Sequence, residues 1–168
     1  MSVDPEAVVS ALADADQTVA VAEGVTGGLV CARLTDVPGA SDVLERGYVP
    51  YAYDALRTQL GVDRETLDEH GAVSEPVARV LARRARDRAD ATWGVATVGV
   101  AGPGGGTADR PVGTVVAGLA HAAPWGTRDS WARADRRTFD GDRRAVRDGG
   151  AAWALARLHE AVVFHGSD

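Results

Sequence analysis

The sequence predicts an α/β fold, a three-layer α/β/α sandwich around a mixed sheet. Helical patterns alternate with short apolar runs along most of the chain, which is typical of α/β folds. Two late strand-like segments, 112–121 and 127–139, follow each other around Pro124-Trp125-Gly126, and such a pair is antiparallel. The 168 residues, 45% of them hydrophobic, fit one domain spanning 1–168.

The first part of the chain alternates helix and strand. A helix is expected over 4–15, because Asp4 can cap it and a proline follows in its first turn. The β-branched run 18–22 is expected to be a buried strand. Apolar spacing predicts a helix over 29–34, which a Pro-Gly pair ends. A strand is expected over 43–52, because its tyrosines and valines favour β structure.

Helices dominate the middle of the chain. Short helices are expected over 54–60, which a glycine ends, and over 63–69. A longer one covers 74–89, because a serine can cap it and arginines crowd its C-terminal end. Residues 92–101 are the most strand-like segment of the chain. After the late strand pair, apolar residues at helical spacing predict a last helix over 143–163.

Composition restricts the function classes. All 18 basic residues are arginine, and 24 acidic residues give a net charge of −6, which is unfavourable for duplex nucleic acid. The longest uncharged run, 91–108, ends in a glycine loop rather than in a membrane span. Without a signal-peptide pattern, and with Cys31 alone unable to form an internal disulfide, we expect a cytoplasmic protein with no membrane and no nucleic-acid partner. The single cysteine is expected to be a core residue.

The histidines do not predict a metal site. They lie at positions 70, 121, 159 and 165, and none of these spacings places two imidazoles on one helical face. We therefore expect neither a metal nor a cofactor.

Three segments could bind an anion. Thr26-Gly27-Gly28 leads from a strand into a helix, where free N–H groups favour phosphate or carboxylate, although the glycines could serve tight packing alone. The loop 102–106 follows another strand, and such loops gather at the carboxyl ends of strands. Arg143 and Arg147, one turn apart, could clamp an anion or simply line a solvated helix start that Asp142 caps.

Eight ordered motifs cover the chain from about residue 18 to 161. They are Ala22-Glu23-x-x-Thr26-Gly27-Gly28, Val37-Pro38-Gly39-Ala40-Ser41, Gly47-Tyr48-Val49-x-Tyr51, Leu60-Gly61-Val62, His70-Gly71-Ala72-Val73-Ser74-Glu75, Ala101-Gly102-Pro103-Gly104-Gly105-Gly106, Pro111-Val112-Gly113-Thr114-Val115 and Gly141-Asp142-Arg143. With these motifs the chain resembles the C-terminal domain of CinA, the competence/damage-inducible protein. Stand-alone members of that family are nicotinamide mononucleotide (NMN) deamidases, and homo-oligomers are usual among them.

The resemblance implies a chemistry whose key side chains are absent here. In the family a serine attacks the carboxamide of NMN and a lysine acts as its base, which releases ammonia and nicotinic acid mononucleotide. The serine position is Gly24, the lysine position is Leu56, and a position that usually carries a hydroxyl is Val98. Arg57 cannot replace the lysine, because a guanidinium stays protonated. Thr26, Ser41 or Tyr51 could supply a relocated hydroxyl, but no partner base is visible for any of them.

The binding positions match the family better than the catalytic ones. The candidate catalytic residues are Glu23, Thr26 and Tyr51. The candidate ligand-binding residues are Thr26, Gly27, Gly28, Gly102, Gly104, Gly105, Gly106, Arg143 and Arg147. The leading hypothesis is a homo-oligomeric domain that binds an NMN-like nucleotide, with lost or altered deamidase activity. The alternatives are a deamidase that uses a relocated nucleophile or a water activated by Glu23, and a non-catalytic structural or regulatory subunit.

Overall fold

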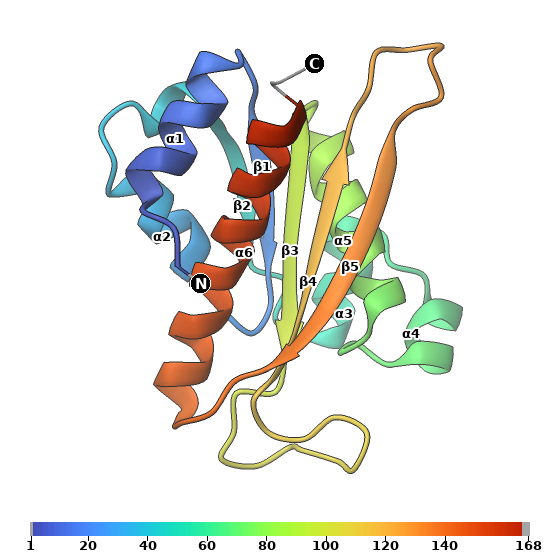
Figure 1. Cartoon of the computed structure of the whole chain (residues 1–168). Helices are drawn as coiled ribbons and strands as arrows, with labels where there is room; N and C mark the ends of the chain where they lie inside the picture. The colour runs from blue at the N-terminus through green and yellow to red at the C-terminus, as the bar shows by residue number, and fades with distance from the viewer. Residues whose placement is uncertain (1, 166–168) are drawn as a thin grey trace.

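Five strands form one mixed sheet between two layers of helices in the computed structural model, which describes residues 2–165 (Figure 1). The elements in chain order are α1 (Pro5–Asp14), β1 (Val19–Glu23), α2 (Leu29–Thr35), a 3₁₀ turn (Ala40–Asp42), β2 (Leu44–Tyr48), α3 (Tyr53–Leu60), α4 (Arg64–His70), α5 (Glu75–Ala89), β3 (Trp93–Gly99), β4 (Thr114–His121), β5 (Trp131–Thr138) and α6 (Arg143–His165). Each helix and strand expected from the sequence is present.

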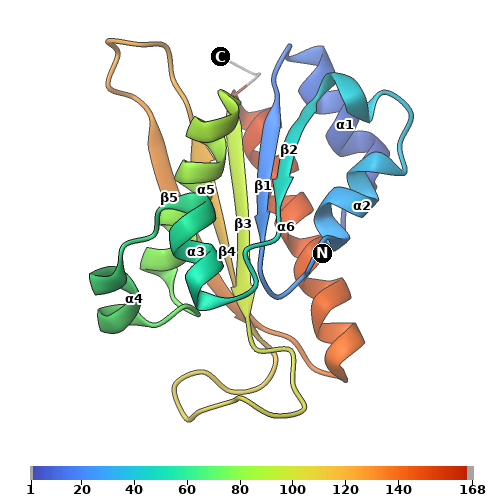
Figure 2. The same cartoon turned by 180° about the vertical axis from the view of Figure 1, so that it is seen from behind.

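The sheet order is β2-β1-β3-β4-β5. β1 pairs in parallel with β2 and β3, whereas β3–β4 and β4–β5 are antiparallel, which confirms the mixed sheet. Because β1 and β3 run side by side in the same direction, the loops that follow them meet at one end of the sheet. The turn between β4 and β5 lies at the opposite end, as both views show (Figures 1 and 2).

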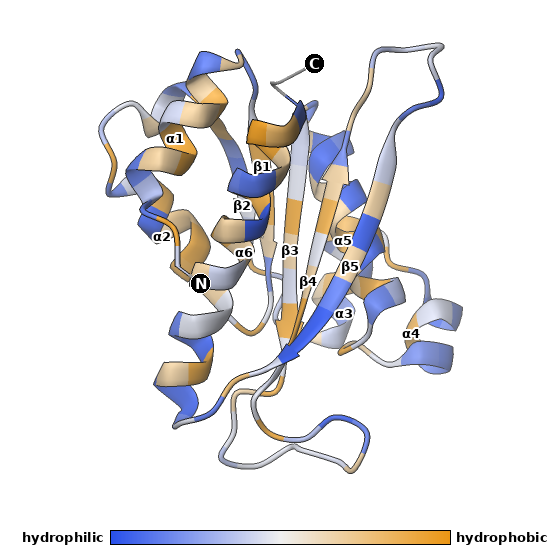
Figure 3. Ribbon diagram, viewed as in Figure 1, coloured by the Kyte–Doolittle hydropathy of each residue, from blue (hydrophilic) through white to orange (hydrophobic). Residues whose placement is uncertain are grey.

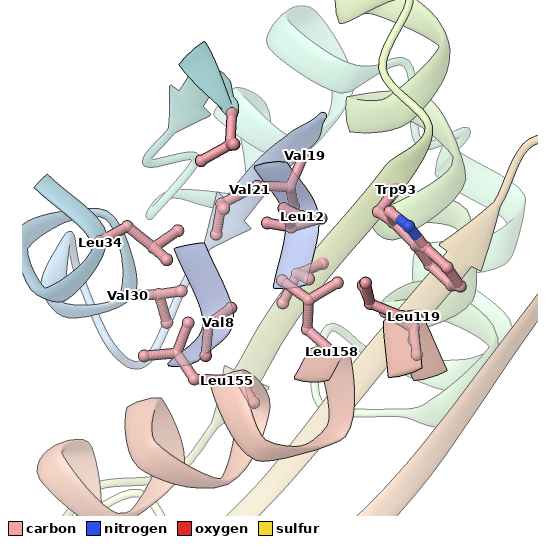
Figure 4. Packing of buried hydrophobic residues seen from close by; sticks show 14 of the residues in the cluster. Val8, Leu12, Val19, Val21, Val30, Leu34, Trp93, Leu119, Leu155 and Leu158 are labelled. Carbon is pink, nitrogen blue, oxygen red and sulfur yellow. The ribbon is translucent and has the colours of Figure 1, made fainter. Parts of the chain in front are cut away.

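The two faces of the sheet carry separate helical layers. α1, α2 and α6 cover one face, and α3, α4 and α5 cover the other (Figures 1 and 2). On the first face Val8 of α1, Val30 of α2 and Leu158 of α6 enclose a core that also holds Trp93 (Figure 4). The second core is built from smaller side chains, many of them alanines of α5. This arrangement confirms the three-layer sandwich.

α5 lies unusually close to the sheet. A Cβ atom on Gly94 would lie 1.9 Å from the Ala82 carbonyl oxygen, and one on Gly118 would lie 2.2 Å from that of Ala78. Both distances are far below van der Waals contact, so no side chain fits at either strand position. The glycines therefore set how closely the helix packs.

The late hairpin differs from the expected one. The predicted strand over 127–139 starts only at Trp131, so the connection from β4 is longer than a turn around Pro124-Trp125-Gly126. Positive φ angles at Gly126 and Arg128 take the chain away from the ladder, and a proline has no N–H to donate to it. β5 forms one edge of the sheet and is largely hydrophilic (Figure 3).

The predicted strand over 43–52 ends early, at Tyr48, and α3 starts at Tyr53. The short segment between them passes the end of the sheet where the β1 and β3 loops meet. Among residues 2–165, no helix combines the length and the apolar character that crossing a membrane requires.

Candidate functional site

A cavity of about 330 Å³ opens at the carboxyl ends of β1 and β3, at the lower end of the molecule in Figure 1. Ligand sites in open α/β sheets usually occupy this place, and the volume is at the small end of the range for small-molecule pockets. Its lining comes from the loops after β1, β2 and β3, from α3, from the α4–α5 loop and from the start of α6. The lining residues are Gly24, Val25, Pro50, Tyr51, Leu56, Ala72, Val73, Val98, Gly99, Val100, Ala101, Gly102, Gly104, Gly105 and Arg143.

Gly24, Leu56 and Val98 all line this cavity, although they come from three different parts of the chain. Gly24 follows β1 and its N–H donates to the Thr97 carbonyl oxygen at 2.8 Å, which holds it beside β3. Leu56 is a buried residue of α3, and Val98 is a buried residue of β3. The positions that the family resemblance links to catalysis are therefore brought together, and here they form an apolar surface.

Backbone forms much of another wall. Gly102, Gly104 and Gly105 line the cavity, and two of them have positive φ angles, +84° at Gly102 and +85° at Gly105. Gly106 does not line it. A Cβ atom there would lie 2.8 Å from the Val112 nitrogen, so this glycine is needed for close packing of the loop on itself.

Arg143 and Tyr51 form a polar pair at the cavity mouth. The Arg143 guanidinium donates to the Gly102 carbonyl oxygen at 2.8 Å and to the Tyr51 hydroxyl at 3.0 Å. These bonds hold an exposed cation in the cavity lining. The helix start behind it is capped as expected, with the Asp142 carboxylate accepting from the Ala145 N–H at 2.9 Å.

Arg147 does not join Arg143 at the cavity. Its guanidinium donates to the carbonyl oxygens of Val25 and Thr26, at 3.2 and 3.0 Å. Arg147 thus connects α6 to the loop after β1, and the two arginines do not form the anion clamp that their spacing allows. Of these two arginines, Arg143 lines the cavity and Arg147 does not.

Glu23 occupies the anion position at the start of α2. Its buried carboxylate accepts hydrogen bonds from the Thr26 hydroxyl at 2.6 Å and from three backbone N–H groups, those of Gly28 (2.9 Å), Val30 (3.0 Å) and Cys31 (2.8 Å). An internal carboxylate therefore occupies the place where Thr26, Gly27 and Gly28 could have bound an external anion. Neither Glu23 nor Thr26 lines the cavity.

Thr97 extends this buried network and was not anticipated from the sequence. The Thr26 and Thr97 hydroxyl oxygens lie 2.6 Å apart, and both residues are fully buried. Because the Thr26 proton is donated to Glu23, Thr97 must be the donor to Thr26. Thr97 is visible in the sequence as a hydroxyl residue within the apolar segment 92–101. A strand pattern does not predict which polar group such a residue bonds with.

Ionisable groups are scarce at the cavity. Among the described residues that line it, only Tyr51 and Arg143 have ionisable side chains, and none is a serine, threonine, cysteine, histidine, lysine or carboxylate. Ser41 lies in the 3₁₀ turn and lines a different surface hollow. Within 2–165, no three histidine, cysteine or carboxylate side chains are grouped so that they could hold a metal ion.

Cys31 is expected to be a poor nucleophile. Burial, together with the negative charge of Glu23, raises the pKa of the Cys31 thiol to about 12. At pH 8 a thiol with so high a pKa is almost entirely protonated, so we expect the native protein to react with Ellman's reagent about a hundredfold more slowly than the urea-unfolded chain. The rate should rise as the pH approaches 12. Equal rates for the native and unfolded protein would contradict this prediction.

Comparisons with known proteins agree with the motifs. The family model described as the CinA C-terminal domain matches residues 4–162. A CinA-like protein of Anaeromyxobacter sp. (strain K) is 51% identical over 158 residues, which are 94% of this chain and 37% of that protein. A CinA-like protein of Chlorobaculum tepidum is 52% identical over 121 residues, covering 72% and 29%. The chain thus spans less than two-fifths of the length of these relatives.

Solved structures of similar size share the fold. The competence/damage inducible protein CihA from Agrobacterium tumefaciens superposes with a TM-score of 0.85 at 36% identity, covering 96% of this chain and 99% of the other. A CinA superfamily protein from Klebsiella pneumoniae gives a TM-score of 0.86 at 30% identity, covering 95% and 96%. With the motifs, the family model and these structures in agreement, the chain belongs to the CinA C-terminal domain family.

Proposed function

We propose that this domain binds an NMN-like pyridine nucleotide in the cavity and does not hydrolyse it by the family's serine–lysine route. One observation carries the proposal. Gly24, Leu56 and Val98 converge on the same cavity that keeps Arg143, Tyr51 and the glycine wall. The parts suited to binding are assembled, whereas the side chains needed for nucleophilic attack are missing.

The cavity matches the chemistry of a pyridine mononucleotide. The Arg143 guanidinium at the mouth can pair with a phosphate in a bidentate, charge-assisted contact. The Tyr51 ring can face the positively charged pyridinium through a cation–π contact. Leu56, Val73 and Val98 supply an apolar surface for the ring. None of the described residues that line the cavity is a carboxylate that would repel the phosphate.

The same lining does not support attack on a carboxamide. Nucleophilic catalysis needs a hydroxyl or thiol and a nearby group that accepts its proton. Gly24 has no side chain, Leu56 cannot accept a proton, and the Arg143 guanidinium stays protonated. The Tyr51 hydroxyl accepts a hydrogen bond from Arg143, and none of the described residues in the cavity lining has a side chain that could take its proton. Tyr51 therefore has no base, while Thr26, whose hydroxyl donates to the Glu23 carboxylate, and Ser41 both lie outside the cavity lining.

A water activated by Glu23 is also not supported. A general base must reach the water and have an oxygen free to accept its proton. Glu23 is fully buried, lies outside the cavity lining and already accepts four hydrogen bonds. A non-catalytic structural or regulatory subunit remains the alternative, and it differs from the proposal in predicting no nucleotide binding.

Calorimetry and chromatography with NMN test the proposal. We expect saturable binding of NMN and no formation of nicotinic acid mononucleotide during prolonged incubation, at low and at molar salt. Product formed by the pure protein would overturn the claim of lost hydrolysis. Absence of binding would overturn the nucleotide site and favour the structural subunit.

Neighbouring arginines offer a matched control for this experiment. Arg143→Ala should weaken NMN binding by about ten- to a hundredfold, because it removes a charge-assisted contact to the phosphate. Arg144→Ala removes the same charge one residue away, where the side chain is 90% exposed and pairs with Asp148 at 3.7 Å. It should leave the affinity unchanged. Equal losses for the two variants would mean that Arg143 acts only through net charge.

A further inference from the structure

An exposed apolar segment adjoins the cavity mouth. Val49, Tyr51 and Tyr53 are all exposed, at 48%, 66% and 54%, and they lie within five residues of one another. The other exposed large hydrophobic residues of 2–165 are scattered over a loop, the β4–β5 connection and the end of α6. We refer to residues 49–53 as the mouth segment. Such a cluster beside a pocket usually marks a binding surface.

Both tyrosine hydroxyls are anchored to groups that line the cavity. The Tyr51 hydroxyl accepts from Arg143 at 3.0 Å, and the Tyr53 hydroxyl accepts from the Ala72 N–H at 3.2 Å. Ala52 between them has extended backbone angles, φ −86° and ψ 156°, and the two tyrosines border different spaces, Tyr51 the cavity and Tyr53 a separate hollow. Hydrogen bonds therefore hold the hydroxyl ends of both side chains, although both residues remain exposed.

Three groups suited to a ligand thus lie near one another. They are the apolar cavity, the Arg143–Tyr51 pair in its lining, and the Tyr53 ring, which lies outside the lining but is bonded through its hydroxyl to Ala72 of that lining. A mononucleotide would use only the first two. A ligand with a second base beyond its phosphates would use all three, because a base stacks well on an exposed, positioned tyrosine.

We propose that the preferred ligand is a pyridine dinucleotide rather than a mononucleotide. This inference rests on the proposed function. The pyridine ring lies in the cavity, the pyrophosphate pairs with Arg143, and the second base stacks on Tyr53. Val49, a short apolar side chain, borders the same surface. The mouth segment is then the part of the site that selects ligand length.

The test compares NMN with nicotinamide adenine dinucleotide (NAD) by calorimetry on the same protein. We expect NAD to bind about tenfold more tightly than NMN, the effect of one stacked base. Tyr53→Ala should abolish that ratio. Tyr53→Phe should retain it, because the ring remains when the bond to Ala72 is lost. Trp125→Ala is the matched control, since this fully exposed aromatic lies in the β4–β5 connection at the opposite end of the molecule (Figure 1).

The outcomes separate this inference from the proposed function. If NMN binds and NAD binds equally or more weakly, the dinucleotide site is wrong while the nucleotide site stands. If neither binds, both fail. If Tyr53→Ala leaves the NAD-to-NMN ratio unchanged but lowers the sedimenting mass of the free protein, the mouth segment is a protein interface and the inference is overturned.

Discussion

Replacing Glu23 with alanine is expected to lower the free energy of unfolding by about 3–5 kcal/mol, because it leaves several buried donors without an acceptor. In the native protein the Thr26 hydroxyl and the N–H groups of Gly28, Val30 and Cys31 all donate to the Glu23 carboxylate. The substitution leaves these four donors without their acceptor. It also removes the negative charge that stabilises the start of α2. Urea denaturation at neutral pH would measure the loss.

Glu45→Ala is the matched control, because it removes the same side chain from an exposed position of β2. It should change the free energy of unfolding by about 0.5 kcal/mol or less. Glu23→Gln should fall between the two, since one amide oxygen can still accept while the amide NH₂ meets backbone donors. Equal stability of the Glu23→Ala and Glu45→Ala variants would show that the network contributes nothing to folding.

The double substitution Gly24→Ser with Leu56→Lys should create NMN deamidase activity, about 10³-fold or more above the unsubstituted protein, as pairs of a hydroxyl and its base do elsewhere. Both positions line the cavity, so the new side chains would meet there. A lysine at position 56 would stand among apolar groups, and that environment favours the neutral amine that can accept a proton. Chromatography of NMN incubations would measure the product.

A second variant at position 24 separates the effect of the new hydroxyl from the effect of the added side-chain volume. A Cβ atom there lies 3.0 Å from the Thr97 carbonyl oxygen and 3.7 Å from a Val98 methyl carbon, so β3 must shift slightly to admit any side chain. Gly24→Ala with Leu56→Lys requires the same shift but lacks the hydroxyl, and it should be inactive. If the serine–lysine variant folds and binds NMN yet shows no activity, these two positions alone do not account for the missing chemistry, and Val98 becomes the next candidate.

The sequence predicted the fold well because its signals are local. The helices at Pro5–Asp14 and Glu75–Ala89 begin at the capping residues Asp4 and Ser74, whose side chains accept from backbone N–H groups as expected. β3 could be recognised from its nearly continuous apolar character, which Thr97 alone interrupts. The hairpin loop was misjudged, since a positive φ at a non-glycine residue such as Arg128 leaves no mark in a sequence pattern.

The site was predicted only in part, because a motif does not show which way its side chains point. Arg143 and Tyr51 reach the cavity mouth as the motifs suggest. Glu23 and Thr26 stand in the same motif as Gly24, yet their side chains bond with α2 and β3 instead. Arg147 likewise bonds with the loop after β1, whereas Arg143 lines the cavity. Whether a polar group meets a ligand or the protein itself depends on long-range packing.

The glycine-rich wall of the cavity has an evolutionary consequence. Its shape depends on backbone course at residues such as Gly102 and Gly105, not on the side chains that carry chemistry. Side chains such as Leu56 and Val98 can therefore change by mutation while the backbone wall of the cavity keeps its shape. Under the proposed function, a few point mutations separate a domain of this fold that converts its ligand from one that only binds it.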